Sequence, residues 1–277
     1  MTMNSTRPDY VVPTGDFIEE WMEEEGINAA ELARRLDVSR KHVSELLRGK
    51  APLSHDMALR LENTTGVPAR IWNLHETGYQ AALARQAADA KLVTQYDRAK
   101  EFPLSYLRKH SFITAPASDK AGTVRGLLQF FGISSMDAFQ ATWNQGAVAY
   151  RRSAVGHHDP HRLATWLRAA ERSCTPGDFP IYDRENLEAA LPELRSLTVE
   201  DPVQAIQKAQ ALLRDCGVAL TLVPAVPGLG THGATRWIQG HPLIQLSDLW
   251  KCDDQLWFTL FHEIAHVLLH ESNGLYL

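Results

Sequence analysis

Residues 29–49 read AAELARRLDVSRKHVSELLRG, and their pattern predicts the structure of the N-terminal part of the chain. Apolar residues repeat at helical spacing over its first eight positions, directly after Asn28, which is a favoured helix N-cap. Ser39 can cap a second helix that runs to Arg48, just before a glycine. The stretch therefore predicts two short helices joined by a tight turn at residues 37–39.

The second predicted helix carries a basic, outward-facing end. Residues 34–50 contain six basic and two acidic residues, whereas five glutamates stand just upstream. The helical repeat turns Val43, Leu46 and Leu47 inward and leaves the basic first turns outside. A helix that follows a tight turn and is basic at its N-terminal end is the arrangement that enters the DNA major groove. Solvated helix faces are the alternative explanation for such blocks of charge.

Helical spacing continues on both sides of this stretch. The apolar residues concerned are Phe17, Ile18, Trp21 and Met22 before it and Met57, Leu59, Leu61 and Val67 after it. With the trailing Trp72-Asn-Leu74, residues 13–85 resemble a HigA-type antitoxin, one of the Cro/cI-like (XRE) helix-turn-helix regulators. The resemblance implies a DNA-binding homodimer that represses its own operon, in a toxin–antitoxin or phage-related setting, often with a cognate toxin as partner.

The expected contacts with double-stranded operator DNA follow from position on these helices. Because the whole chain has a net charge of −5, DNA affinity must come from this local patch. Arginine and lysine can donate to guanine edges, and serine can address a base or a phosphate. The residues expected in the groove are Ser39, Arg40, Lys41, His42 and Ser44. Those expected at phosphates or the DNA backbone are Asn28, Arg48 and Lys50. Arg34 and Arg35 are either solvated or paired with the upstream glutamates.

The rest of the chain predicts a mainly α fold with a small mixed segment at its end. Residues 81–100 suggest a long connecting helix. A strand is expected over 217–223, a hairpin over 235–247 that turns at Gly240-His241, and a helix from Asp253 to about Glu271. The expected domains are an N-terminal helix-turn-helix bundle at 1–85, a helical middle region at 86–215, and a small α+β segment at 216–277.

The last predicted helix contains the spacing His262-Glu-x-x-His266. Histidines at i and i+4 share one helix face and can reach one tetrahedral Zn²⁺, and Glu263 would project beside the metal as a general base. The short pattern also occurs by chance. The alternative is a pair of core histidines, in which case Glu263 would need some other buried partner.

Residues 217–270 resemble the ImmA/IrrE metallo-endopeptidases, zinc proteins that in several systems cleave a repressor. The resemblance implies a zincin-like domain with His262 and His266 as ligands and Glu263 as the catalytic base. In that family the third ligand is a glutamate on a later helix, and only eleven residues follow His266. His270 lies about 12 Å from His262 along a helix axis, too far to share its ion.

The source of a third ligand is therefore open. Glu271 qualifies only if the helix ends early, and no motif supports the upstream candidates. Those candidates are His232, His241 and Asp248. We expect the chain to be a truncated form of a longer protein.

Two functions are compatible with these features. The first is a DNA-binding transcriptional regulator of the antitoxin type that carries an incomplete zinc-peptidase scaffold. The alternative is an active zinc metallo-endopeptidase that its DNA-binding head delivers to a repressor or partner protein. The three cysteines are scattered, and the sequence has no signal peptide and no apolar run of about 18 residues. A cytoplasmic protein without a membrane partner is expected.

Overall fold

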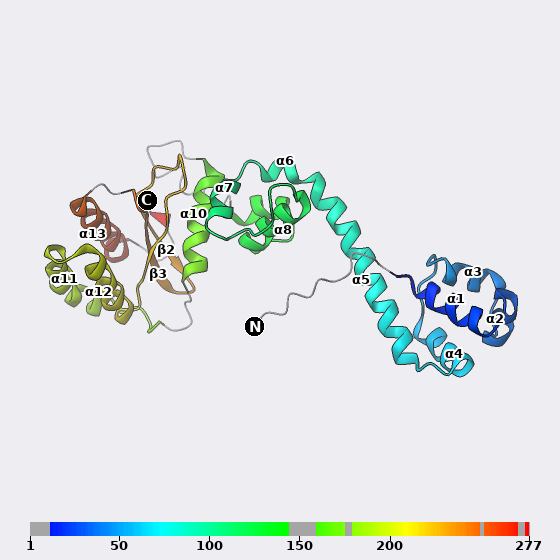
Figure 1. The fold of residues 1–277 in the computed structure, drawn as a ribbon. Helices are drawn as coiled ribbons and strands as arrows, with labels where there is room; N and C mark the ends of the chain where they lie inside the picture. Colours follow the sequence, from blue (N-terminus) through cyan, green and yellow to red (C-terminus); the bar gives the residue numbers. More distant parts are fainter. Residues whose placement is uncertain (1–11, 144–158, 175–178, 250–251, 271–274, 277) are drawn as a thin grey trace. The chain divides into compact units, whose positions relative to one another are not determined.

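The computed structural model describes residues 12–143, 159–174, 179–249, 252–270 and 275–276. It divides into two compact units, Met1–Lys91 and Leu92–Leu277, and the mainly α fold with a small sheet near the end of the chain is confirmed (Figure 1). No helix among the described residues combines the length and the apolar character that crossing a membrane requires.

The first unit is a bundle of helices around one apolar core. Its helices are α1 (Thr14–Glu24), α2 (Ala29–Leu36), α3 (Arg40–Leu47), α4 (His55–Thr65) and α5 (Ala69–Thr94). The two predicted helices and their turn are confirmed as α2 and α3. Asp37 ends α2 in the left-handed conformation with φ of 55°. The core includes Ile18, Leu32, Val43 and Leu61, none of which is exposed.

The prediction that the long helix begins near residue 81 was wrong, because α5 already begins at Ala69. Two buried residues anchor this earlier part. Trp72 packs into the core of the unit, and Glu76 accepts a hydrogen bond of 2.7 Å from the Thr14 hydroxyl. These contacts hold the helix through Gly78, a residue of low helix propensity.

The second unit consists of helices packed on a four-stranded sheet. Its helices before the sheet are α6 (Tyr96–Ala99), α7 (Leu104–Lys109), α8 (Lys120–Phe131), a segment at 136–143, α10 (Pro160–Ser173), α11 (Arg184–Ser196), the 3₁₀ turn η2 (Leu197–Val199) and α12 (Pro202–Asp215). Pro160 and Pro202 each occupy a first helical turn, where proline loses no hydrogen bond, after the capping residues Asp159 and Asp201.

The sheet has the strand order β1-β3-β2-β4. Its strands are β1 (Ala219–Leu222), β2 (Gly233–Ile238), β3 (His241–Leu246) and β4 (Leu275–Tyr276). The predicted hairpin is confirmed as β2 and β3, with the turn at Gln239-Gly240, one residue earlier than expected. Both turn residues have positive φ, which is the conformation that a tight hairpin of this twist requires. In addition, β1 pairs with β3 in parallel, and β4 covers the outer edge of β2.

The two faces of the sheet contact different helices (Figure 1). Ala219, Ala234 and Leu243 pack in one core with α7, α8 and α10. The residues next to them in the strands pack in a second core with α11, α12 and α13 (Asp253–Leu269). Because side chains alternate along a strand, the neighbours Thr235 and Arg236 of β2 point to opposite sides.

Gly15 supplies a test of the packing between α1 and α3. A Cβ atom at Gly15 would lie 2.1 Å from the backbone oxygen of Leu47, whereas a Cβ at Gly78 would meet nothing within 4 Å. We expect Gly15→Ala to lower the free energy of unfolding by about 1–3 kcal/mol through overpacking. Gly78→Ala, the control, should raise it by about 0.5–1 kcal/mol because alanine favours a helix. Urea unfolding followed by circular dichroism measures both, and a shift of the same sign in the two variants would contradict the packing.

Candidate nucleic-acid interface and histidine pair

The first turns of α3 present basic side chains to solvent, as predicted. Arg40 and Lys41 are exposed, and His42 and Ser44 are half-buried. Lys41 Nζ lies 3.7 Å from a Glu45 carboxylate oxygen, but both side chains are well exposed, so this ion pair is weak and leaves the lysine available to another anion. On the opposite side, Val43 and Leu46 are buried in the core of the unit and fix the orientation of the helix.

Side-chain caps set the beginning of both helices. The Asn28 side-chain oxygen accepts hydrogen bonds of 3.0 Å from the backbone N–H groups of Ala30 and Glu31. The Ser39 hydroxyl oxygen accepts one of 3.1 Å from the backbone N–H of His42. In both caps the side-chain oxygen is the acceptor. The Asn28 side-chain N–H groups and the Ser39 O–H can therefore still donate to a phosphate.

The remaining basic residues of the stretch divide into paired and exposed ones. Arg34 and Arg35 both pair with Glu31 of their own helix, rather than with the glutamates of α1. Arg48 and Lys50 are exposed at the end of α3 and just beyond it. The structure thus places all the expected DNA-contacting residues on α2, α3 and their flanks, and their individual roles stay predictions.

Arg60 of α4 is a positioning residue that the sequence did not reveal. Its guanidinium donates to the backbone oxygens of Leu36 and Asp37 at 3.0 and 3.2 Å, and its Nε donates to Asp56 at 2.9 Å. Arg60 thereby holds the end of α2 and the turn that leads into α3. The Asp56–Arg60 spacing of four residues was visible in the sequence, but the reach of Arg60 to α2 depends on tertiary packing.

Comparison with known proteins places this geometry in a family. A family model described as helix-turn-helix matches residues 18–72. The uncharacterized HTH-type transcriptional regulator YddM of Escherichia coli (strain K12) is 32% identical over 85 residues, which cover 29% of this chain and 90% of YddM. This chain belongs to the helix-turn-helix transcriptional regulators. It is a DNA-binding regulator, and the DNA-binding unit is the first of its two units.

The solved structures that are similar to this regulator match about the same share of its chain as YddM does. PA4674 of Pseudomonas aeruginosa, solved with its operator DNA, is 32% identical, with 28% of this chain and 85% of that chain covered and a TM-score of 0.27. The antitoxin GraA is 30% identical, with coverage of 30% and 91% and a TM-score of 0.29. An addiction module antidote protein of the HigA family from Coxiella burnetii is 24% identical, with coverage of 30% and 90% and a TM-score of 0.28.

In the second unit of this regulator, His262 and His266 come together on one side of α13. Their Nε2 atoms are 3.1 Å apart, although His262 is exposed and His266 only half-buried, so the two are not core histidines. Two nitrogens that bind one tetrahedral Zn²⁺ at about 2.0–2.1 Å lie about 3.3 Å apart. Partial burial of the His266 imidazole lowers its pKa most, and the neighbouring His262 and His270 lower it further. The lowered pKa favours the neutral form that a metal requires.

The described residues do not complete a metal site. They contain no group of three or more His, Cys, Asp or Glu side chains arranged to hold a metal. His270 follows the last residue of α13, and its ring stacks on His266 and on Tyr276, with centroids 5.1 and 4.6 Å away. Asp248, an upstream candidate, accepts a hydrogen bond of 2.7 Å from the backbone N–H of Ala225. Glu271 lies outside the described residues. The histidine pair thus fits two of the four ligand positions of a tetrahedral zinc site.

Glu263, the expected base, is enclosed between α13 and β2 and is 1% exposed. Its carboxylate accepts a hydrogen bond of 2.7 Å from the Thr235 hydroxyl. A Cβ atom at Gly233 would lie 2.5 Å from the carboxylate, so the glycine makes room for it. Burial raises the pKa of Glu263 to about 7, although the Thr235 hydrogen bond lowers it in part. Thr235 and Gly233 were not found from the sequence, because neither belongs to the histidine motif.

The raised pKa of Glu263 predicts a loss of stability with rising pH. Because the unfolded carboxyl ionises near 4.5 and the folded one near 7, the folded state loses stability as pH rises through this window. The loss should reach about 3 kcal/mol above pH 8, since each pKa unit corresponds to about 1.4 kcal/mol. Glu263→Gln should remove this dependence, whereas Glu185→Gln, on the exposed face of α11, should keep it. Urea unfolding between pH 4.5 and 8.5 in EDTA measures the effect, and parallel curves for wild type and Glu263→Gln would contradict it.

Proposed function

We propose that the protein is an antitoxin-type autorepressor that binds operator DNA as a homodimer and pairs with a cognate toxin. The observation that carries the proposal is the exposed basic start of α3 within a helix-turn-helix unit. The side-chain cap at the start of α2 and the hydrogen bonds from Arg60 to the end of α2 hold α3 in a fixed orientation. A rigid helix loses little conformational freedom on binding, so its contacts contribute fully to affinity.

The proposed contacts divide by position along the two helices. Arg40 and Lys41, on the first turn of α3, address base edges, with Ser39, His42 and Ser44 beside them. Asn28, at the N-terminus of α2, donates to a phosphate, where the helix dipole also favours an anion. Arg48 and Lys50 add phosphate contacts at the other end of α3. A homodimer would place two such helices about one turn of DNA apart, and the operator would then be an inverted repeat.

Substitution of the two first-turn cations tests this assignment. Arg40→Ala and Lys41→Ala should each weaken binding to the DNA upstream of the protein's own gene by about 1–3 kcal/mol, the value of a good base contact. The matched control is Arg70→Ala, which removes one exposed positive charge from α5 of the same unit. Gel shifts at constant salt measure all three. Equal losses of DNA affinity for Arg40→Ala and Arg70→Ala would mean that Arg40 acts only through its charge. That result would contradict its assignment to a base contact.

A second candidate function rests on the histidine pair. We propose that His262 and His266 bind Zn²⁺, with Glu263 as the general base of an ImmA/IrrE-like metallo-endopeptidase acting on a repressor. The distance of 3.1 Å between the two Nε2 atoms supports the proposal. A bound zinc ion lowers the pKa of its water toward about 7. The enclosure of Glu263 keeps a carboxyl with a pKa of about 7 next to the pair, in the range that suits a general base.

Metal content distinguishes the two candidates. We expect protein purified without chelator to hold about one Zn²⁺ per chain, and His262→Ala to lose it, because one remaining imidazole binds zinc too weakly. The control His270→Ala, which removes a stacked ring outside α13, should keep the metal. Elemental analysis measures the ratio. Zinc that is absent from the wild type, or kept by His262→Ala, would remove the metallopeptidase candidate and leave the regulator.

A further inference from the structure

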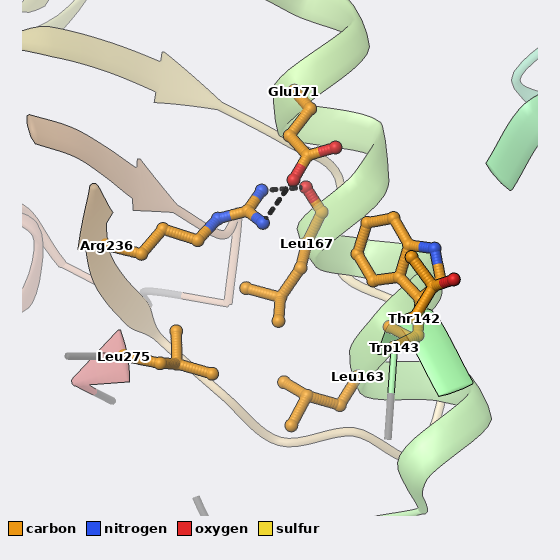
Figure 2. Close-up of a pocket in the computed structure, with 8 residues that line it drawn as sticks. Thr142, Trp143, Leu163, Leu167, Glu171, Arg236 and Leu275 are labelled. Atoms are coloured by element: carbon orange, nitrogen blue, oxygen red, sulfur yellow. Dashed lines mark hydrogen bonds and ion pairs between the residues drawn. The ribbon is translucent and has the colours of Figure 1, made fainter. Parts of the chain in front are cut away.

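A cavity of about 320 Å³ lies in the second unit (Figure 2). It is on the side of the sheet opposite to Glu263, because Arg236 lines it whereas the adjacent Thr235 bonds Glu263. Helix α10, residues 142–143, β2 and β4 provide its walls, which are mostly apolar. Figure 2 shows the side chains of Leu163, Leu167 and Leu275 around the space, with Trp143 on the far side from Arg236. A volume above about 300 Å³ with a few polar groups is typical of small-molecule sites.

The polar end of the cavity holds Arg236 and Glu171, and Arg168 pairs with the same Glu171 carboxylate without itself lining the cavity. Arg236 donates to a Glu171 oxygen at 2.6 Å and to the backbone oxygen of Leu167. Arg168 donates to the other Glu171 oxygen. Two guanidinium groups thus share one carboxylate, and all three side chains are largely buried. A buried charge without its own counterion is costly, so a bound anion would be stabilised here.

Arg236 also has a hydrogen-bond donor left over. Its Nε is buried and has no partner among the described residues, and only 12% of its side chain is exposed. Burial lowers the pKa of Arg236, in agreement with a cation that its surroundings only partly compensate. Unpaired buried donors are rare in folded proteins, and this one shows that the surroundings of Arg236 satisfy its guanidinium only in part. A carboxylate is the acceptor that matches a guanidinium in both charge and geometry.

We propose that this cavity binds a small amphipathic carboxylate, with the carboxylate at Arg236 and the apolar body between α10 and β4. The volume sets the size of the ligand. A cavity of about 150 Å³ accommodates benzene, so about twice that volume takes roughly ten to twelve non-hydrogen atoms. Octanoate has the right size, and its saturated chain matches walls of leucine side chains. The residues that line the cavity are different from those proposed to contact DNA and from His262 and His266.

Calorimetric titration of the full-length protein with octanoate tests the site. We expect saturable binding of octanoate, and binding at least about tenfold weaker for 1-octanol and for octylammonium, because only the anion meets Arg236. No saturable binding of octanoate, or equal binding of the alcohol, would overturn the proposal. Stronger binding of the ammonium ion would overturn it as well, since Glu171 would then dominate the site.

A pair of rim variants locates the binding. Thr142 lines the cavity and is exposed, so Thr142→Trp should fill the space without disturbing the core and should weaken octanoate binding at least about tenfold. The preceding residue, Ala141, is also exposed but does not line the cavity, so Ala141→Trp is the matched control and should bind as the wild type does. Unchanged affinity of Thr142→Trp would place octanoate elsewhere and overturn the assignment.

A second pair of variants tests the role of the two charged residues, and their expected effects on octanoate binding are opposite. Arg236→Gln should weaken octanoate binding, and Glu171→Gln should strengthen it several-fold, because removal of the shared carboxylate leaves Arg236 at the cavity without its counterion. Melting temperatures identify variants that fail to fold. If the ion pair were only structural, both variants would weaken binding, and that result would overturn the proposal.

Discussion

The structure depends on one constraint, namely that burying a polar side chain between elements is costly unless it forms a hydrogen bond, and key buried polar side chains find their partners on another element. In the first unit the Thr14 hydroxyl donates to Glu76, which connects the start of α1 to α5. In the second unit the buried side chain of Gln245 donates to the backbone oxygen of Trp166 at 2.7 Å and joins β3 to α10. Such bonds between distant parts of the chain specify how the helices and the sheet fit together, in addition to the non-directional packing of their cores.

The same constraint acts on β2, which is covered on both sides. Thr235 meets Glu263 of α13 on one face, and the adjacent Arg236 meets Glu171 of α10 on the other. The pleat of the strand therefore separates two chemistries that are neighbours in sequence. One face holds the Glu263 carboxyl group, which has a pKa of about 7, beside two histidines. The other face holds the Arg236 guanidinium at an apolar cavity. A register shift of one residue would exchange the two faces and leave both polar groups without partners.

Local signals were sufficient to predict the first unit and insufficient for the second. The caps Asn28 and Ser39 and the turn between them lie within a few residues of the helices they define, so the sequence revealed α2 and α3 almost to the residue. The hairpin of β2 and β3 was predictable for the same reason. The parallel pairing of β1 with β3 and the pairing of β4 with β2 join segments more than twenty residues apart. No local pattern encodes such pairings, and for the same reason the partners of Glu263 and the reach of Arg60 were not found.

The short strand β4 connects the two faces of the sheet. Leu275 pairs with Arg236 and lines the cavity, whereas Tyr276 pairs with Thr235 and stacks on His266 with centroids 4.9 Å apart. One planar peptide unit joins these two residues, and both pair with β2 in the same ladder. The wall of the cavity and the ring beside the histidine pair therefore form one structural element.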